Sequence, residues 1–111
     1  MTQKILEFNR LCAEFLGYIK LTEKSGLLEY DKVYKDLEDK YVSENSLKFH
    51  FDWNCIHEVV NAIKNTQNPK EHSDTTFSTL RIEIQTHLGR GNKEAVVEAI
   101  DKFLIWYEQN K

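Results

Sequence analysis

The residues FHFDWNCIHEVV, at positions 49–60, carry the clearest structural signal in the chain. Within and just beyond this stretch, apolar side chains recur at the spacing of one helix face, at Trp53, Ile56, Val59, Val60 and Ile63. Asp52 precedes the first of them, and aspartate is a preferred N-cap because its carboxylate accepts hydrogen bonds from the first backbone N–H groups of a helix. The sequence therefore predicts a helix from about Trp53 to Lys64, capped by Asp52.

Apolar side chains also repeat every three or four residues over Thr2–Leu16, where they form one stripe along a predicted helix. Thr2 is placed to cap its start. Gly17 follows its end, where a left-handed backbone conformation is common and glycine adopts it most readily. We therefore expect an N-terminal helix bounded by Thr2 and Gly17.

A third helix is predicted over Lys93–Gln109, after a glycine-containing turn at 89–91, with Asn92 as its N-cap. Its apolar face is wide, because Ile105 and Trp106 extend the usual stripe. The helix is therefore either central to the core or presents an apolar strip to a partner.

Apolar and polar residues alternate strictly from Leu80 to Leu88, which is the period of a strand with one solvated face. A helical pattern through Phe77, Leu80, Ile84 and Leu88 competes with this interpretation. We assign the strand, because the alternation holds across the whole segment.

The remaining segments carry weaker patterns. Tyr18–Leu21 predicts a short strand, and Glu23–Gly26 predicts a turn. Leu27–Ser46 fits either a short helix capped by Asp31 or an edge strand, and it stays unassigned. Asn65–Thr76 contains the only proline and is expected to be an exposed loop.

These elements predict an α+β fold in which about three helices pack on a small, mainly antiparallel sheet that includes Leu80–Leu88. A chain of 111 residues is expected to form a single domain over residues 1–111.

Composition excludes several classes of function. The 15 Lys and Arg against 18 Asp and Glu give a net charge of −3, so duplex nucleic acid is not an expected partner. No run of about 18 apolar residues is present that would cross a bilayer. Met1–Lys4 leads into an amphipathic segment, which differs from the apolar core of a secretory signal. We expect a cytoplasmic protein with no membrane partner.

His50, Asp52, Cys55 and His57 carry side chains that zinc accepts as ligands. Their spacing argues against a metal site, because Cys55 and His57 point in nearly opposite directions on a helix that begins after Asp52. The same geometry separates the thiol from a base that could activate it. We predict no metal site, no cofactor and no catalytic residues, with Cys12 and Cys55 as small buried hydrophobes. The sequence thus favours a role other than catalysis.

The segment Gly89–Lys93 is the sharpest candidate for a binding site. Glycines allow backbone N–H groups to converge, and the N-terminus of the following helix carries positive partial charge. Because Arg90 and Lys93 add formal charge, phosphate is the expected ligand. We name Arg90, Gly91, Asn92 and Lys93 as candidate ligand-binding residues. The alternative is a plain connection between a strand and a helix.

Aromatic side chains are the second resource for a ligand. His50 and Trp53 complete the set of candidate ligand-binding residues, because aromatic rings can stack a purine or a similar base. Aromatic residues at helical spacing are more often part of the core, and the core is the default interpretation for Trp53 and Trp106.

The segments Leu11–Tyr18, Leu47–Asn54 with Val59–Val60, and Lys93–Val96 through Phe103–Tyr107 form a recognisable combination. Together they resemble a family of small uncharacterised accessory proteins encoded by tailed phages and mobile elements of Bacteroidetes-type bacteria. The chain departs from the family pattern at Cys55, where a second tryptophan is common, and at His57, where a Met-like residue stands. The resemblance implies a phage or mobile-element accessory protein, and it implies no established activity.

Our first hypothesis joins this resemblance to the turn at 89–93. It is a non-enzymatic binding protein that acts in the host cytoplasm against a defence pathway, by sequestering a phosphate-bearing nucleotide signal. The alternative is a protein-interaction module that inhibits or recruits a host defence protein through the C-terminal helix, whose apolar strip would also support a homo-oligomer. A small enzyme acting on nucleotides is the third hypothesis. Exposed Ile105 and Trp106 would favour the second, whereas a concave pocket lined by Arg90, Lys93 and an aromatic ring would favour the first.

Overall fold

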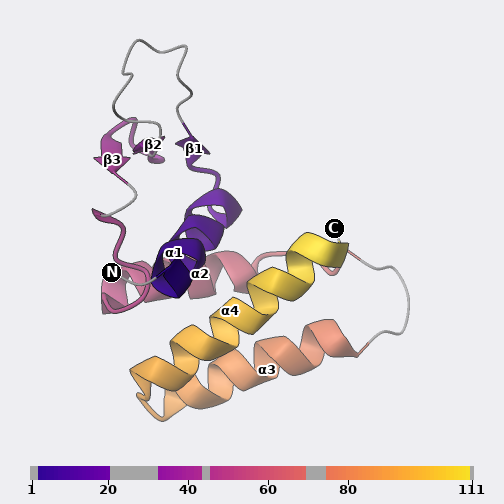
Figure 1. Ribbon diagram of the computed structural model, residues 1–111. Coiled ribbons are helices and arrows are strands. Elements are labelled where there is room, and N and C mark those ends of the chain that lie inside the picture. The colour runs from indigo at the N-terminus through magenta and orange to yellow at the C-terminus, as the bar shows by residue number, and fades with distance from the viewer. Residues whose placement is uncertain (1–2, 21–32, 44–45, 70–74, 111) are drawn as a thin grey trace. The chain divides into compact units, whose positions relative to one another are not determined.

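The computed structural model describes residues 3–20, 33–43, 46–69 and 75–110. These ranges contain four helices and one three-stranded sheet (Figure 1). The helices and strands are α1 (Gln3–Phe15), β1 (Ile19–Lys20), β2 (Val33–Lys35), β3 (Tyr41–Ser43), α2 (Trp53–Lys64), α3 (Thr76–Gly89) and α4 (Lys93–Asn110). The α+β class and the antiparallel sheet are confirmed, with one helix more than the sequence predicted.

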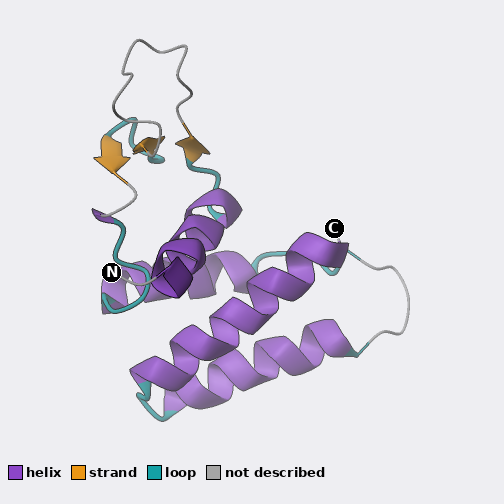
Figure 2. Cartoon of the chain, in the orientation of Figure 1, coloured by secondary structure: helices purple, strands orange, loops and turns teal. Residues whose placement is uncertain are grey.

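The chain divides into two compact units, residues 1–48 and residues 49–111. The first unit holds α1 and the sheet, and the second holds α2, α3 and α4 (Figure 2). In the described part of the second unit, α2, α3 and α4 contact one another. Whether the two units unfold together as a single domain stays a prediction.

The end of α1 has the conformation that its sequence predicts. Gly17 has a φ of 91°, in the left-handed region. The N–H groups of Gly17 and Tyr18 donate to the carbonyls of Glu14 and Ala13, at 3.1 and 2.9 Å. These bonds satisfy carbonyl groups that the last helical turn leaves without partners. The short strand predicted after this glycine is β1, whereas the predicted cap Thr2 lies outside the described residues.

The sheet has the order β1-β2-β3, and both pairs are antiparallel, with Tyr34 opposite Val42 in the second pair. Asp36 holds the turn between β2 and β3, because its Oδ1 accepts two backbone hydrogen bonds of 2.9 Å. Both strands fall within Leu27–Ser46, so the described part of that segment adopts the strand alternative. The turn predicted at Glu23–Gly26 lies outside the described residues.

In the second unit, α3 and α4 form an antiparallel helical hairpin and lie side by side (Figure 1). The Phe77 and Phe103 ring centroids are 5.7 Å apart, and Trp106 lies 5.9 Å from Phe77. At the exposed edge of the hairpin, Lys102 Nζ forms an ion pair with Glu83 Oε1 at 3.3 Å. The helix α2 contacts both α3 and α4. Aromatic packing between the two helices thus holds the hairpin together.

The strand predicted at Leu80–Leu88 is wrong, because these residues belong to α3. Phe77 and Ile84, two helical turns apart, are both buried. Ile82, which alternation would place on the same face as Ile84, is instead 64% exposed. The competing helical pattern therefore decides the structure, since it accounts for which side chains are buried. The strand prediction requires Ile82 on the buried face of a strand. In the helix this side chain is exposed, which is acceptable because single apolar side chains are common on protein surfaces.

The other three helices match their predictions closely. The helix α2 spans Trp53–Lys64 as expected, while α1 and α4 differ by one residue at their ends. The loop predicted at Asn65–Thr76 is confirmed at its described residues 65–69 and 75, whereas Thr76 is already the first residue of α3. Of the candidate ligand-binding residues, Trp53 lies in α2 and Lys93 in α4, whereas His50 and residues 90–92 lie outside the helices.

Candidate ligand-binding surface

Asp52 fixes the first turn of α2. Its Oδ1 accepts hydrogen bonds from the backbone N–H groups of Asn54, at 2.8 Å, and Cys55, at 3.4 Å. The predicted N-cap is therefore confirmed. The cap places Trp53 at the first helical position, and its indole ring is half-buried.

The Trp53 ring contacts both a cation and an imidazole. Lys93 Nζ lies 5.4 Å from the centroid of the Trp53 ring, which is within cation–π range. The ring of His57, one turn further along α2, lies 5.8 Å from it with the planes tilted by 33°. The fold thus brings together two candidate ligand-binding residues, Trp53 and Lys93, from the first turns of α2 and α4.

The turn from α3 to α4 ends one helix and caps the next. Gly91 has a φ of 66°, and the N–H groups of Gly91 and Asn92 donate to carbonyls in the last turn of α3, at 3.0 and 3.3 Å. Asn92 Oδ1 accepts a hydrogen bond of 3.2 Å from the first turn of α4, which confirms this cap. The N–H groups of Gly91 and Asn92 already have acceptors, so the side chains of Arg90 and Lys93 supply the formal positive charge that this segment offers to a phosphate.

This turn joins two helices, so the expected connection between a strand and a helix is corrected along with the strand itself. Arg90 is exposed, whereas Lys93 is half-buried against Trp53. Glu94 lies in the first turn of α4, where a carboxylate interacts favourably with the helix dipole. The surface therefore offers Lys93 beside one aromatic ring, with the exposed Arg90 three residues earlier in the chain and the carboxylate of Glu94 one residue later.

His50 lies before α2, and its ring packs edge-on against Phe51 with centroids 4.6 Å apart. Partial burial lowers the pKa of His50 below its ordinary value of 6.5, because removal from water disfavours the charged imidazolium. At neutral pH this side chain is uncharged. It can therefore donate or accept a hydrogen bond at a ligand, and it does not add positive charge for a phosphate.

The side chains considered as zinc ligands are directed differently. Cys55 is half-buried, whereas His57 is exposed and lies against Trp53. Among the residues that the structure describes, no group of three His, Cys, Asp or Glu side chains is placed to hold a metal ion. Cys12 is buried, and neither Cys12 nor Cys55 belongs to a disulfide.

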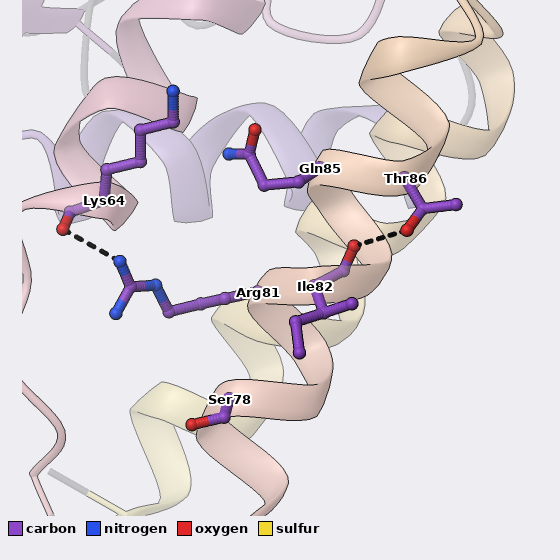
Figure 3. A pocket seen from close by; sticks show the side chains of 6 residues that line it. All are labelled: Lys64, Ser78, Arg81, Ile82, Gln85 and Thr86. Carbon is purple, nitrogen blue, oxygen red and sulfur yellow. Dashed lines mark hydrogen bonds between the residues drawn. The ribbon is translucent and has the colours of Figure 1, made fainter.

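A pocket that was not predicted from the sequence lies between the end of α2 and the outer face of α3 (Figure 3). Its volume is about 760 Å³. It is lined by Lys64, Ser78, Arg81, Ile82, Gln85 and Thr86. Four of these residues, at positions 78, 81, 82 and 85, have the spacing of one helix face. The helical pattern in the sequence therefore indicates that they lie together. The strand prediction did not indicate this shared face, because successive residues of a strand point to opposite faces of the sheet.

No model of a known protein family, no curated protein and no solved structure matches this chain. Within the described ranges, none of the helices combines the length and the apolar character that crossing a membrane requires.

Proposed function

We propose that this chain is a non-enzymatic binding protein whose surface at Trp53, Arg90 and Lys93 holds a phosphate-bearing nucleotide. The observation that carries the proposal is the distance of 5.4 Å between Lys93 Nζ and the centroid of the Trp53 ring. A nucleotide needs an aromatic face for its base and positive charge for its phosphate. This contact places both at one point of the surface.

Binding exchanges the partners of Trp53 and Lys93. The Lys93 ammonium moves from the indole to the phosphate, and the base takes its place over the ring. A cation–π contact contributes about 0.5–2 kcal/mol, and the value rises as the contact is removed from water. Stacking of a base on an aromatic side chain contributes about 1–3 kcal/mol. Stacking therefore offsets the loss of the cation–π contact, and the contact of Lys93 with the phosphate supplies the gain. The exposed Arg90 adds a second cation.

The resemblance to phage and mobile-element accessory proteins supports a cellular role for this binding. In that role, the protein sequesters a nucleotide that a host cell uses to signal attack, and it acts in the host cytoplasm. Such a protein needs affinity without turnover. A surface made of one ring and two cationic side chains meets this need, because stacking and charge supply affinity without a reacting group.

Calorimetric titration against a panel of cyclic and linear nucleotides tests the proposal. Trp53→Leu removes the aromatic face, and Lys93→Gln and Arg90→Gln each remove one charge. We expect each variant to bind about fivefold to tenfold more weakly, which corresponds to about 1–1.4 kcal/mol. Lys102→Gln is the matched control on α4, and it should bind as the wild type does.

The salt dependence of binding separates the contribution of charge from the contribution of base stacking. Raising the salt concentration should weaken wild-type binding, and it should weaken binding by the Arg90→Gln and Lys93→Gln variants less, because exposed charge contacts are screened. Thermal melts check that the charge variants stay folded. We expect a stability change within ~0.5 kcal/mol for Arg90→Gln and a loss of about 1 kcal/mol for Lys93→Gln, which removes the cation–π contact. Equal affinities in all proteins, or no binding to any nucleotide of the panel, would remove the proposal.

A second candidate is a protein-interaction module that uses α4, and one observation favours it. Ile105 on α4 is 45% exposed, although Trp106 is half-buried against Phe77 and Phe103. Ile105 is thus the member of the predicted pair that a partner can reach most easily. Light scattering of the wild type and of Ile105→Glu tests self-association through this helix. A wild-type monomer whose mass the substitution leaves unchanged would exclude that form of the hypothesis.

A further inference from the structure

The pocket between α2 and α3 lies at the other end of α2 from Trp53, and its most ordered cation is Arg81. Arg81 Nη2 donates a hydrogen bond of 3.0 Å to the backbone carbonyl of Lys64. The guanidinium carbon also lies 5.1 Å from the centroid of the Phe77 ring. Figure 3 shows Arg81 and Gln85 both directed from α3 toward the last turn of α2. A guanidinium held in this way loses little freedom when it receives an anion, and several of its N–H groups remain to do so.

The charged residues that line the pocket are both cationic. Lys64 and Arg81 are cationic, and none of the six lining residues is acidic, although the chain as a whole carries a net charge of −3. Among the described residues, no carboxylate forms an ion pair with either cation. Ser78 and Gln85 add a hydroxyl and an amide as neutral donors. The pocket therefore complements negative charge.

An apolar side chain lies beside these cations. Ile82 lines the pocket and is 64% exposed. The hydroxyl of Thr86 donates to the Ile82 carbonyl at 2.9 Å, so Thr86 is already engaged within α3. The pocket is open, whereas sites for small molecules enclose most of their ligand. An open surface with two cations beside an exposed isoleucine fits a segment of chain that lies across it.

We propose that this pocket binds an acidic segment of a partner protein. Arg81 receives a carboxylate as a paired hydrogen-bond donor, and Lys64 contacts a second carboxylate or the same one as a point charge. An apolar side chain next to the acidic residue packs on Ile82. The site is separate from the nucleotide surface, and it gives the chain a second partner of defined chemistry.

Selection from a random peptide library displayed on phage tests this proposal without presupposing the partner. The wild type, Lys64→Gln, Ile82→Ser and the control Lys102→Gln are used as bait. Lys64→Gln removes one of the two positive charges of the pocket while keeping the backbone carbonyl that holds Arg81. Arg81 itself is left unchanged, because its contacts with that carbonyl and with Phe77 also hold α2 and α3 together.

We expect the wild type and Lys102→Gln to enrich peptides in which an acidic residue adjoins an apolar one. The most enriched peptide, made synthetically, should bind Lys64→Gln about twofold to fivefold more weakly than the wild type, which is the effect of one exposed ion pair. Ile82→Ser should also weaken binding. Amide NMR shifts on titration should change at Lys64 and over 78–86, and a peptide with glutamine in place of glutamate should leave them unchanged.

Four results would overturn the proposal: no enrichment, enrichment of peptides without acidic residues, equal affinity for the wild type and Lys64→Gln, or shift changes elsewhere in the chain. Succinate is titrated separately as a free dicarboxylate. Tighter binding of succinate than of the peptide, at the same amides, would identify a small-anion pocket and would also contradict a peptide site.

Discussion

At the residue scale, the carboxylate of Asp52 decides where α2 begins, because its Oδ1 accepts hydrogen bonds from Asn54 and Cys55. Asp52→Ala should lower the free energy of unfolding by about 1 kcal/mol, since the alanine leaves these N–H groups without their acceptor. Asp52→Asn keeps an acceptor and should stay within a few tenths of the wild type. Urea denaturation of the three proteins measures the difference. An unchanged midpoint in Asp52→Ala would show that the cap adds no stability.

His50 gives the protein a predicted dependence on pH. Burial lowers its pKa in the folded state below the ordinary 6.5, so the unfolded state binds more protons over that interval. The contribution of the neutral imidazole is therefore complete above pH 6.5 and is lost as the pH falls toward the folded-state pKa. We expect the stability of the wild type, measured relative to His50→Gln, to fall as the pH is lowered from neutrality through about 6.5. Parallel stability curves for the two proteins would show that burial does not act on this imidazole.

At the element scale, two glycines in one turn should respond oppositely to the same change. Gly91 has a φ of 66°, a conformation that costs an alanine about 1 kcal/mol or more. Gly89 is the last residue of α3, and an added Cβ there meets nothing within 4 Å. Gly91→Ala should therefore destabilise the protein, whereas Gly89→Ala should stabilise it by about 0.5 kcal/mol. Thermal and urea midpoints of the two variants test this, and a shift of the same sign in both would be incompatible with the turn described.

The α3 element also shows why periodicity over a short segment can mislead. Alternation and helical spacing share Leu80, Ile84 and Leu88, because four residues is a multiple of the strand period and close to one helical turn. The two patterns differ at Ile82, and only packing shows that this side chain is exposed. The pocket was not predicted for the same reason. Its lining residues on α3 share a helix face, and the strand prediction separates them.

At the scale of the whole molecule, the single-domain prediction can be tested because natural probes lie in different units. Trp53 and Trp106 belong to residues 49–111, whereas the buried thiol of Cys12 belongs to residues 1–48. In a Cys55→Ser background, tryptophan fluorescence and the reactivity of Cys12 report the two units separately. We expect one common midpoint in urea, because each unit is short enough that its core alone is marginal. Two separate midpoints would show that the units unfold independently.

The sequence by itself determined the features that depend on neighbours along the chain. Asp52 at the start of α2, Gly17 after α1 and Asn92 before α4 have the roles predicted for them. These predictions succeed because capping hydrogen bonds and left-handed stops join groups within a few residues of each other, so the local sequence holds the information.

Only the tertiary structure decided which helix faces meet. The contact of Lys93 with Trp53, the bond from Arg81 to the Lys64 carbonyl and the exposure of Ile82 all depend on residues that are distant in the sequence. Patterns along one segment show which of its faces is apolar, but they do not show which other segment covers that face or where a charged side chain finds its partner. The candidate surfaces of this protein are formed by such pairings, because each takes its side chains from two helices.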